Sequence, residues 1–318
     1  MELRKDEHRD FVHRMMSAKN LMYYLSAPYR LNTVYWAVNS MLILEDQRAA
    51  EAQGEAVAYV LRSKNTDGGF GGSEGYPSNI TSTFNALQIL YMCKYRYEGE
   101  DTVKYICGLQ QGSGCFHNDE YGEEDTRINC CAVLSLHLLC LLGEGCFGTE
   151  MLAAPMDGSY LTSIGIDVPR IIEYTLRCFN KDGGFGAIPG AESHAAQVFC
   201  CLSVLRSLGA LECIDRTRVR RFITMRQTAS GGLAGRINKK EDVCYSFWAY
   251  SSAVMIGEQQ CIDEECLIRF ILSCQGKAGG FSDRPGNETD LYHLMFALAG
   301  LSLLGYSGLR KIDAGFGL

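Results

Sequence analysis

Gly183-Gly184-Phe185 belongs to a repeated motif that decides how this chain folds. The triplet recurs, with Phe or Leu in third place, as Gly68-Gly69-Phe70, Gly231-Gly232-Leu233 and Gly279-Gly280-Phe281, and Gly114-Cys115-Phe116 is a degraded copy. The third residues of the five copies are 46, 69, 48 and 48 positions apart. A period near 48 residues predicts a repeat architecture, in which each unit packs on its neighbours. The long step carries an insertion within residues 143–165.

Each repeat has one helical pattern before the glycine loop and another after it. The first is amphipathic, as in Val168–Asn180, and the second is apolar on nearly all sides, as in Ala195–Leu208 and Leu294–Leu304. A helix that is apolar all round must be buried. The alternation therefore predicts an all-α fold, an α/α barrel (toroid) of about six helix pairs in two concentric rings. We expect one domain over residues 1–318, with the helices of Leu21–Ser63 counted among those of the barrel. Periodicity alone leaves an open solenoid of helix pairs as the alternative.

Composition narrows the class of protein. Hydrophobic residues make up 47% and charged residues 21% of the 318 residues, which is typical of a globular chain. The net charge of −7 disfavours a nucleic-acid surface. The fifteen cysteines include no CxxC pair, and several lie in apolar runs, which indicates reduced, buried thiols. The apolar runs Cys130–Gly143 and Leu294–Gly305 are shorter than the roughly 20 residues of a membrane span. The charged first ten residues lack the apolar core of a signal peptide. We expect a cytoplasmic protein without an integral membrane segment.

The residue nine positions after each repeat marker is polar in all five copies. These residues are Asn79, Asp125, His194, Asp242 and Asp290. Asn and Asp are preferred at the N-caps of helices, so each of these residues should begin an inner helix. All five helix starts should then lie at one end of the barrel. Capping alone is the alternative to a functional role for them.

Two groups of reactive side chains fall on these helix starts. Asp242, Cys244 and His293 combine a carboxylate, a thiol and an imidazole, and three such ligands with an open fourth position are typical of catalytic zinc sites. A capping Asp, a buried Cys and a satisfied His would also explain them. The second group offers cations and hydrogen-bond donors for phosphate oxygens, or is a solvated charged loop. Its members are His194, Arg236, Lys239 and Tyr245.

At these residues the sequence resembles a known family. Asp242-Val-Cys244-Tyr245-Ser-Phe-Trp248, with Asp290-Leu-Tyr292-His293, resembles the zinc motif of protein prenyltransferase β subunits. The glycine loops match the same family, and the likeness runs from about Leu21 to Gly305. Members of the family fold as α/α barrels.

Within the family, the Rab (type II) geranylgeranyltransferase branch is the most similar. The segments Glu192–Cys201 and Asp283–Gly286 resemble that branch. Asn32 aligns where farnesyltransferase has a Trp that closes its lipid tunnel, and a smaller side chain leaves depth for a fourth isoprene unit. That unit would bury apolar surface worth roughly 2–3 kcal/mol. Tyr292 departs from the branch, because its position looks more like farnesyltransferase.

The resemblance implies roles for individual residues. Asp242, Cys244 and His293 would be metal ligands and, with Tyr245, catalytic residues that hold Zn²⁺ and the substrate thiolate. The second group, His194, Arg236, Lys239 and Tyr245, would bind the diphosphate. The lipid would contact Asn32, Trp36, Phe84, Phe247 and Trp248. Arg127 resembles a pocket arginine, and Asp283 resembles a position that helps to place Mg²⁺ on the diphosphate.

The resemblance also implies a reaction and partners. The donor would be geranylgeranyl diphosphate, and the acceptor a C-terminal cysteine of a Rab GTPase presented by an escort protein. The chain would act as a heterodimer with an α subunit. Farnesyltransferase and type I geranylgeranyltransferase β subunits are the alternatives within the family. Terpene cyclases also use α/α barrels, but neither DxDD nor DDxxD occurs here. A non-catalytic scaffold that keeps the barrel is a more remote alternative.

Overall fold

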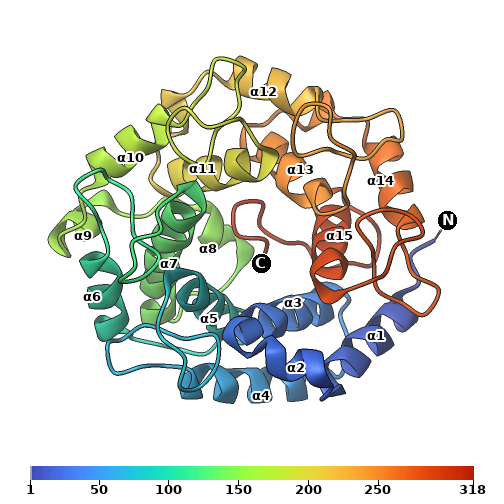
Figure 1. The fold of residues 1–318 in the computed structure, drawn as a ribbon, viewed down its shortest axis with the longest axis horizontal. Helices are drawn as coiled ribbons and strands as arrows, with labels where there is room; N and C mark the ends of the chain where they lie inside the picture. The colour runs from blue at the N-terminus through green and yellow to red at the C-terminus, as the bar shows by residue number, and fades with distance from the viewer. Residues whose placement is uncertain (1) are drawn as a thin grey trace.

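Six helices form the inner ring of the computed structural model, which describes residues 2–318 (Figure 1). They are α3 (Arg30–Ile43), α5 (Ile80–Met92), α7 (Thr126–Glu144), α11 (Ala195–Ser207), α13 (Tyr245–Met255) and α15 (Leu291–Leu303). Each packs on the next in chain order, and α15 packs on α3. That last contact closes the ring, so the predicted α/α toroid is confirmed and the open solenoid is excluded.

Six further helices form the outer ring, each of them beside the inner helix that follows it. They are α1 (Lys5–Ser17), α4 (Ala49–Arg62), α6 (Glu100–Gly108), α10 (Val168–Arg177), α12 (Arg216–Thr224) and α14 (Glu264–Ser273). The helices counted within Leu21–Ser63 are present as α3 and α4, and α1 precedes that range. No glycine triplet follows α1, so the repeat pattern carried no sign of it.

His8 joins α1 to the far end of the chain. Its ring stacks on Phe281 of the fifth glycine loop, with centroids 4.7 Å apart. Nδ1 accepts a hydrogen bond from the Gly280 N–H at 3.0 Å, and Nε2 lies 2.9 Å from Oε1 of Gln275. The N-terminal helix therefore closes the outer ring by contacts with residues about 270 positions away.

The first glycine of each triplet permits close packing between a loop and the next outer helix. Gly183 has a φ of +90°, and a Cβ there would lie 2.1 Å from the carbonyl oxygen of Arg218 in α12. A Cβ added to any of the corresponding glycines would also collide with a backbone carbonyl of the next outer helix. These carbonyls belong to Asp101 (α6), Arg170 (α10), Cys266 (α14) and Glu7 (α1). No side chain fits at this position. Only glycine permits both the positive φ and the close contact between the loop and the helix backbone. The third residue of every triplet is fully buried, which seals the space between neighbouring outer helices.

Polar residues begin the inner helices, as the nine-residue offset predicted, with one exception. The side chains of Asn79, Asp125, His194 and Asp290 accept backbone N–H groups at the starts of α5, α7, α11 and α15. Asp242 instead precedes a tight turn, and α13 begins at Tyr245. Its Oδ1 accepts the N–H of Cys244, at 2.9 Å, rather than an N–H within the helix. This shift leaves the rest of the Asp242 carboxylate available for other contacts.

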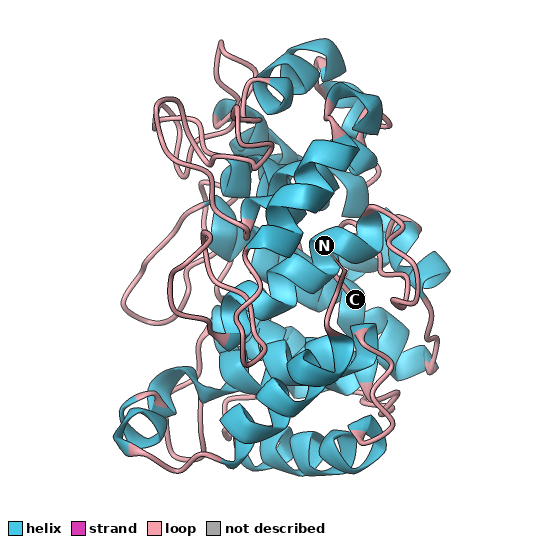
Figure 2. Ribbon diagram, turned by 90° about the vertical axis from the view of Figure 1, so that its right-hand side faces the viewer, coloured by secondary structure: helices cyan, strands magenta, loops and turns pink. Residues whose placement is uncertain are grey.

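Long loops gather at the end of the ring where the inner helices start (Figure 2). The C-terminal tail enters the ring near its centre (Figure 1) and bonds the later turns of the inner helices. Asn39 Nδ2 donates to the Gly317 oxygen at 2.7 Å, and Arg206 forms a two-point ion pair with Asp313 at 2.9 and 2.6 Å. The tail therefore closes the end of the barrel opposite the helix starts.

Residues 143–165 form two short helices, α8 (Thr149–Ala153) and α9 (Gly158–Ser163). Leu152 and Leu161 are buried, and the Met156 N–H donates to the oxygen of Ser207, the last residue of α11. This segment therefore lies near the tail and away from the helix starts. The short helix α2 (Leu21–Leu25) and a 3₁₀ turn (Ala27–Tyr29) precede α3, and two further 3₁₀ turns (Leu211–Cys213 and Gln259–Cys261) precede α12 and α14.

The apolar helix α7 reaches the length and composition of a membrane span, with a mean hydropathy of 1.5. However, 78% of its most apolar window is buried inside the protein, as its place in the inner ring requires. All fifteen cysteines are free thiols.

Candidate active site

Asp242 and His293 face each other where α13 and α15 begin. His293 Nε2 lies 3.6 Å from Oδ1 of Asp242. Its other ring nitrogen, Nδ1, contacts Oδ2 of Asp290 at 2.7 Å, while Oδ1 of Asp290 caps the helix through the His293 N–H. The Cys244 thiol is buried beside the Asp242 carboxylate and the Tyr292 hydroxyl. The structure thus brings together the three residues predicted as metal ligands.

The electrostatics of this group favour a positive charge at its centre. Burial disfavours the imidazolium, but hydrogen bonds with Asp242 and Asp290 outweigh it and raise the pKa of His293 to about 9. Burial and then the neighbouring Asp242 raise the pKa of the Cys244 thiol. The carboxylates therefore hold a proton on His293, in a place where a divalent cation could supply the same charge.

The donor set has the chemistry of a zinc site. It combines a carboxylate, a thiol and an imidazole, and the imidazole is oriented by a further carboxylate, Asp290, as ligating histidines usually are. Among residues 2–318, however, no three His, Cys, Asp or Glu side chains already stand in a metal-binding cluster. Binding an ion here requires the three donors to draw together around it.

His194 and Tyr245 form a donor pair beside this group. The Nδ1 atom of His194 accepts the Ala196 N–H at 3.1 Å, so the ring carries its hydrogen on Nε2. Nε2 lies 3.2 Å from the Tyr245 hydroxyl and donates to it, which leaves the Tyr245 O–H free to donate further. Burial, and then the charge of Arg236, lower the pKa of His194, so its ring is neutral at pH 7. An anion near Tyr245 would receive a hydrogen bond from an already oriented hydroxyl.

Arg236 and Lys239 lie on the loop before Tyr245, at the same rim. Arg236 Nη1 forms an ion pair with Oε2 of Glu192 at 3.0 Å, which ties the loop to the segment before His194. Lys239 is exposed. Gly235 leaves room for Tyr245, because a Cβ at that position would lie 2.4 Å from the Tyr245 ring.

An aromatic cluster joins the two groups. Tyr245 packs on Trp248 (centroids 5.8 Å apart), Trp248 packs on Tyr292 (6.1 Å), and Tyr292 packs on His293 (4.9 Å). Trp36 of α3 packs edge-to-face on Tyr292, with ring centroids 5.2 Å apart. The proposed donors and ligands therefore surround one apolar wall.

The other predicted lipid contacts are more scattered. Asn32 of α3 accepts a hydrogen bond from Asn85 of α5 at 3.0 Å, and Phe84 is partly buried on α5. Phe247 is buried and packs on Phe199 and Phe296. Its ring also lies beside Gly317 of the tail, where a Cβ would come within 3.0 Å of it. Phe247 thus packs against the tail, and Phe296 joins it to the aromatic wall, because Phe296 also packs on Trp248 and Tyr292.

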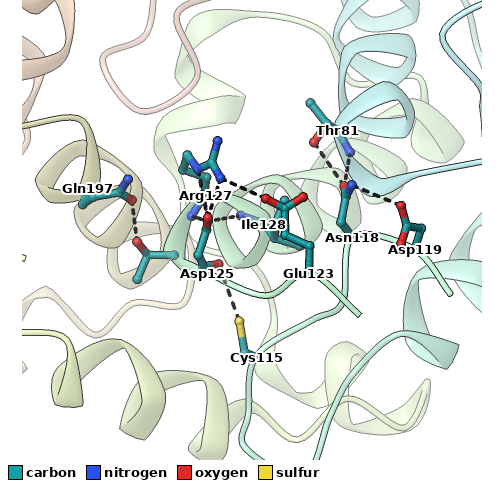
Figure 3. A network of polar contacts seen from close by, with 10 residues as sticks. Thr81, Cys115, Asn118, Asp119, Glu123, Asp125, Arg127, Ile128 and Gln197 are labelled. Carbon is teal, nitrogen blue, oxygen red and sulfur yellow. Dashed lines mark hydrogen bonds and ion pairs between the residues drawn. The ribbon is translucent and has the colours of Figure 1, made fainter. Parts of the chain in front are cut away.

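Arg127 and Asp283 are engaged by their own loops. Arg127 binds the Asp125 carboxylate and Glu123, and the network continues to Gln197 of α11 through Thr126 (Figure 3). Its side chain is 54% exposed, so it remains within reach of a ligand. The Asp283 carboxylate contacts Arg284 at 2.7 Å and accepts a hydrogen bond from Asn287 at 2.7 Å. Within residues 2–318 its carboxylate forms no hydrogen bond or ion pair with the other predicted residues, although the Asp283 carbonyl accepts the Val243 N–H.

Sequence reasoning gave no role to Gly235, and it named Asp290 only as a helix cap and Tyr292 only as part of the family motif. Tyr292 lies at the centre of the aromatic wall, Asp290 orients His293, and Gly235 makes room for Tyr245. The sequence marked Tyr292 as part of the motif that ends at His293 and as a departure from the Rab branch, but not as a member of an aromatic wall. Nothing local distinguished Gly235 from the glycines of the turns.

Comparisons with known proteins agree with this architecture. Residues 3–318 match the family described as "Prenyltransferase alpha-alpha toroid domain". The geranylgeranyl transferase type-2 subunit beta of Saccharomyces cerevisiae is 35% identical over 98% of this chain and 93% of its own. The same subunit of Candida albicans is 36% identical over 78% of this chain and 72% of its own.

A solved structure is similar over the whole ring. Candida albicans protein geranylgeranyltransferase-I, complexed with GGPP, has a TM-score of 0.81 and 21% identity, and the match covers 99% of this chain and 96% of that one. At that identity the likeness shows the fold. With the family match and the two subunits, it places this chain in the prenyltransferase α/α-toroid family, among the protein prenyltransferase β subunits.

Proposed function

We propose that this chain is the catalytic β subunit of a Rab-type protein geranylgeranyltransferase. It would transfer geranylgeranyl from geranylgeranyl diphosphate to C-terminal cysteine thiols of Rab-type small GTPases. The proposal rests chiefly on one arrangement, in which Asp242, Cys244 and His293 lie beside the His194–Tyr245 donor pair along a shared aromatic wall. The names of the two type-2 relatives support the geranylgeranyl donor.

Asp242, Cys244 and His293 would hold a zinc ion. When bound, zinc lowers the pKa of a coordinating thiol, so that the substrate cysteine reacts as a thiolate at neutral pH. Asp290 keeps Nε2 of His293 directed towards Asp242 through its 2.7 Å contact with Nδ1. The acceptor cysteine would therefore approach the side of the wall formed by Tyr292.

The leaving diphosphate would lie against Tyr245, Arg236 and Lys239. His194 donates to the Tyr245 oxygen, and the oriented O–H then donates to a diphosphate oxygen. This contact strengthens as the C1–oxygen bond breaks, because negative charge accumulates on the leaving group. Arg236 adds a guanidinium once it exchanges Glu192 for phosphate oxygens, and Arg127 stands half-exposed on α7. Mg²⁺ bound through Asp283 would need that carboxylate to leave Arg284.

The isoprenoid would extend along Trp36, Trp248 and Tyr292 towards Asn32. Each aromatic ring presents apolar surface, and Asn32 is smaller than the Trp that stands at this position in farnesyltransferase. The Asn85 amide donates to the Asn32 oxygen, which leaves the NH2 of Asn32 and the oxygen of Asn85 for other contacts. We expect this end of the site to accept the longer, twenty-carbon lipid.

The name "subunit beta" of the relatives implies an α-subunit partner. In the Rab branch the GTPase would be presented by an escort protein. We expect the reaction to need the heterodimer, and the escort protein for Rab acceptors.

A donor and acceptor competition tests the proposal. The purified heterodimer is given equal geranylgeranyl and farnesyl diphosphate, with either a Rab GTPase and its escort protein or a CaaX peptide as acceptor. We expect geranylgeranyl transfer to the Rab. Preference for farnesyl diphosphate, or transfer only to the CaaX peptide, would assign the chain to another branch of the family.

Metal analysis tests the site. The heterodimer should contain about one equivalent of zinc, and Cys244→Ala should lose both zinc and activity. The scaffold alternative predicts no stoichiometric zinc in the wild type and no change on substituting Asp242 or His293 by Ala.

A further inference from the structure

The tail, residues 310–318, is held inside the ring by side chains of all six inner helices. Figure 1 shows it ending near the centre of the ring. Five of the helices donate hydrogen bonds to its backbone carbonyls, at 2.5–3.4 Å: Asn39 of α3 to Gly317, Gln88 of α5 to Phe316, Ser203 of α11 to Gly315, Ser251 of α13 to Ala314 and Ser302 of α15 to Arg310. The sixth, α7, contributes His137, whose ring packs edge-on against Phe316 with centroids 5.2 Å apart.

The bonds that hold the tail are buried. The donor side chains of α3, α5, α11 and α13 are at most 2% exposed. Within the tail, the Asp313 carboxylate accepts the N–H groups of Gly315 and Phe316 at 2.8 and 3.0 Å, and the Asp313 carbonyl accepts the Gly317 N–H at 2.8 Å. A buried donor that loses its acceptor costs free energy, so the tail stays in place. It therefore forms a fixed wall across the ring.

The depth of this wall follows from helix geometry. Asn39 lies nine residues after the first residue of α3, and Gln88 and Ser203 each lie eight residues after the first residue of their helices. With a rise of about 1.5 Å per residue, the tail meets the inner helices about 12–14 Å below their starts. The candidate active site lies at those starts. A lipid that is bound there through its diphosphate and runs down the ring would therefore end at the tail.

Aromatic contacts continue from the candidate site to the tail. Phe296 packs on both Trp248 and Tyr292 of the aromatic wall, with ring centroids 4.8 Å apart in each pair. Phe247 packs on Phe296 at 5.6 Å and on Phe199 at 5.3 Å. Phe199 belongs to the inner helix α11 and is only partly buried. A shift of Phe247 would therefore be passed to the rings along which we expect the lipid to lie.

Gly317 is the residue of the tail that meets Phe247. A Cβ at this position would lie 3.0 Å from Cζ of Phe247 and 3.5 and 3.7 Å from its two Cε atoms. These atoms form the far end of the ring, so a methyl group at residue 317 would press the ring away from the tail. The only direction left is towards Phe199 and Phe296, on the side of the candidate site.

We propose that the tail is the end wall of the lipid site, and that Gly317 is a positioning residue that sets, through Phe247, how long an isoprenoid chain fits. A larger residue at position 317 moves Phe247 towards the active site and shortens the space for the lipid. This inference rests on the proposed function and deepens it. It adds a second determinant of lipid length to Asn32, which lies in the first turn of α3.

A pair of glycine variants tests the end wall. Gly317→Ala adds the methyl group against Phe247. Gly305→Ala is the matched control, because its φ of +70° is close to the +72° of Gly317 and, within the described residues, no atom lies within 4 Å of its added Cβ. Both variants carry the same backbone strain, and only one of them presses on the aromatic rings.

The purified heterodimer is given geranylgeranyl or farnesyl diphosphate with the same acceptor, and kcat/KM is measured for each donor. We expect Gly317→Ala to lower the ratio of the geranylgeranyl to the farnesyl value about tenfold, as one methyl group in an apolar pocket does. Gly305→Ala should keep the wild-type ratio. A loss of stability alone would lower both values together and leave their ratio unchanged.

Phe247→Leu removes the ring on which the new methyl group presses. Adding it to Gly317→Ala should therefore restore most of the geranylgeranyl preference, because the two side chains act as a pair. The proposal is overturned if Gly317→Ala has the same donor ratio as Gly305→Ala, or if Phe247→Leu does not raise the ratio of the Gly317→Ala variant. A wild type that prefers farnesyl diphosphate would instead contradict the proposed function, and the change of ratio between the two glycine variants would still decide the role of the tail.

Discussion

Asp290 holds His293 in place by two bonds, one to its backbone N–H at 2.8 Å and one to ring Nδ1 at 2.7 Å. A single carboxylate thus caps α15 and aims Nε2 at Asp242, 3.6 Å away. Asp290 therefore links the start of α15 to the candidate metal site.

Asp290→Asn separates the two roles. Asn is as good a cap as Asp, so thermal stability should change little. Its amide cannot accept from both His293 groups, so the ring loses its orientation and zinc affinity should fall about 10–100-fold. Competition with a chromophoric chelator measures that affinity. Unchanged zinc affinity in Asp290→Asn would contradict the positioning role.

Gly235→Ala should displace Tyr245 without unfolding the chain. The new Cβ would lie 2.4 Å from the Tyr245 ring, which must move away from His194. Misplacement of a donor on this scale costs on the order of tenfold to a hundredfold in turnover. Steady-state prenyl transfer measures it. Gly54→Ala on α4, where nothing lies within 4 Å, is the control and should keep full activity. Equal activity of the two variants would rule out this role of Gly235.

Two glycines with the same backbone angle distinguish strain from close packing. Gly183 (φ +90°) meets the Arg218 carbonyl, whereas Gly190 (φ +82°) has nothing within 4 Å. Gly190→Ala should cost only the left-handed strain, about 1–2 kcal/mol. Gly183→Ala adds a clash with the backbone and should cost roughly 3 kcal/mol or more. Urea denaturation compares the two, and similar losses would mean that the loop relaxes away from α12.

Stability should fall as the pH drops from about 6.5 to about 4. Burial lowers the pKa of both His8 and His137 to about 4, against 6.5 when exposed. The unfolded chain therefore binds protons in this window and the native chain does not, so stability is full above 6.5 and lost below it. The shift corresponds to at most roughly 3 kcal/mol for each residue.

The matched variant is His8→Gln, which keeps a polar side chain at α1 but does not titrate. Its stability, measured by denaturant titration at several pH values, should fall less steeply between pH 6.5 and 4 than that of the wild type. His293 affects stability over a different pH range. Because its pKa is raised, it stabilises the metal-free protein below pH 6.5, and that contribution is lost as the pH rises towards 9. An unchanged slope in His8→Gln would show that His8 does not remain neutral in the fold.

The sequence by itself determined the repeated helix pairs and the end of the fold at which their polar residues gather. The first glycine of each triplet is required locally, because the backbone there has φ near +90° and lies against a neighbouring helix. The same requirement recurs in every copy, so it is visible in the sequence as a repeat. The caps Asn79, Asp125, His194 and Asp290 are equally local, since each bonds a backbone N–H within three residues of itself. From these features, the toroid and the gathering of polar groups at one end could both be predicted.

The tertiary structure alone decided how the ring is closed and how the site is oriented. Three contacts join residues more than 250 positions apart: His8 with Gly280, Asn39 with Gly317, and Trp36 with Tyr292. Such long-range contacts do not recur at a fixed spacing, so the sequence pattern does not reveal them. The displacement of Asp242 from the start of α13 arises in the same way. Interactions between residues close in sequence specify each helix and loop. These long-range features depend instead on which surfaces pack together when α15 contacts α3 and the ring closes.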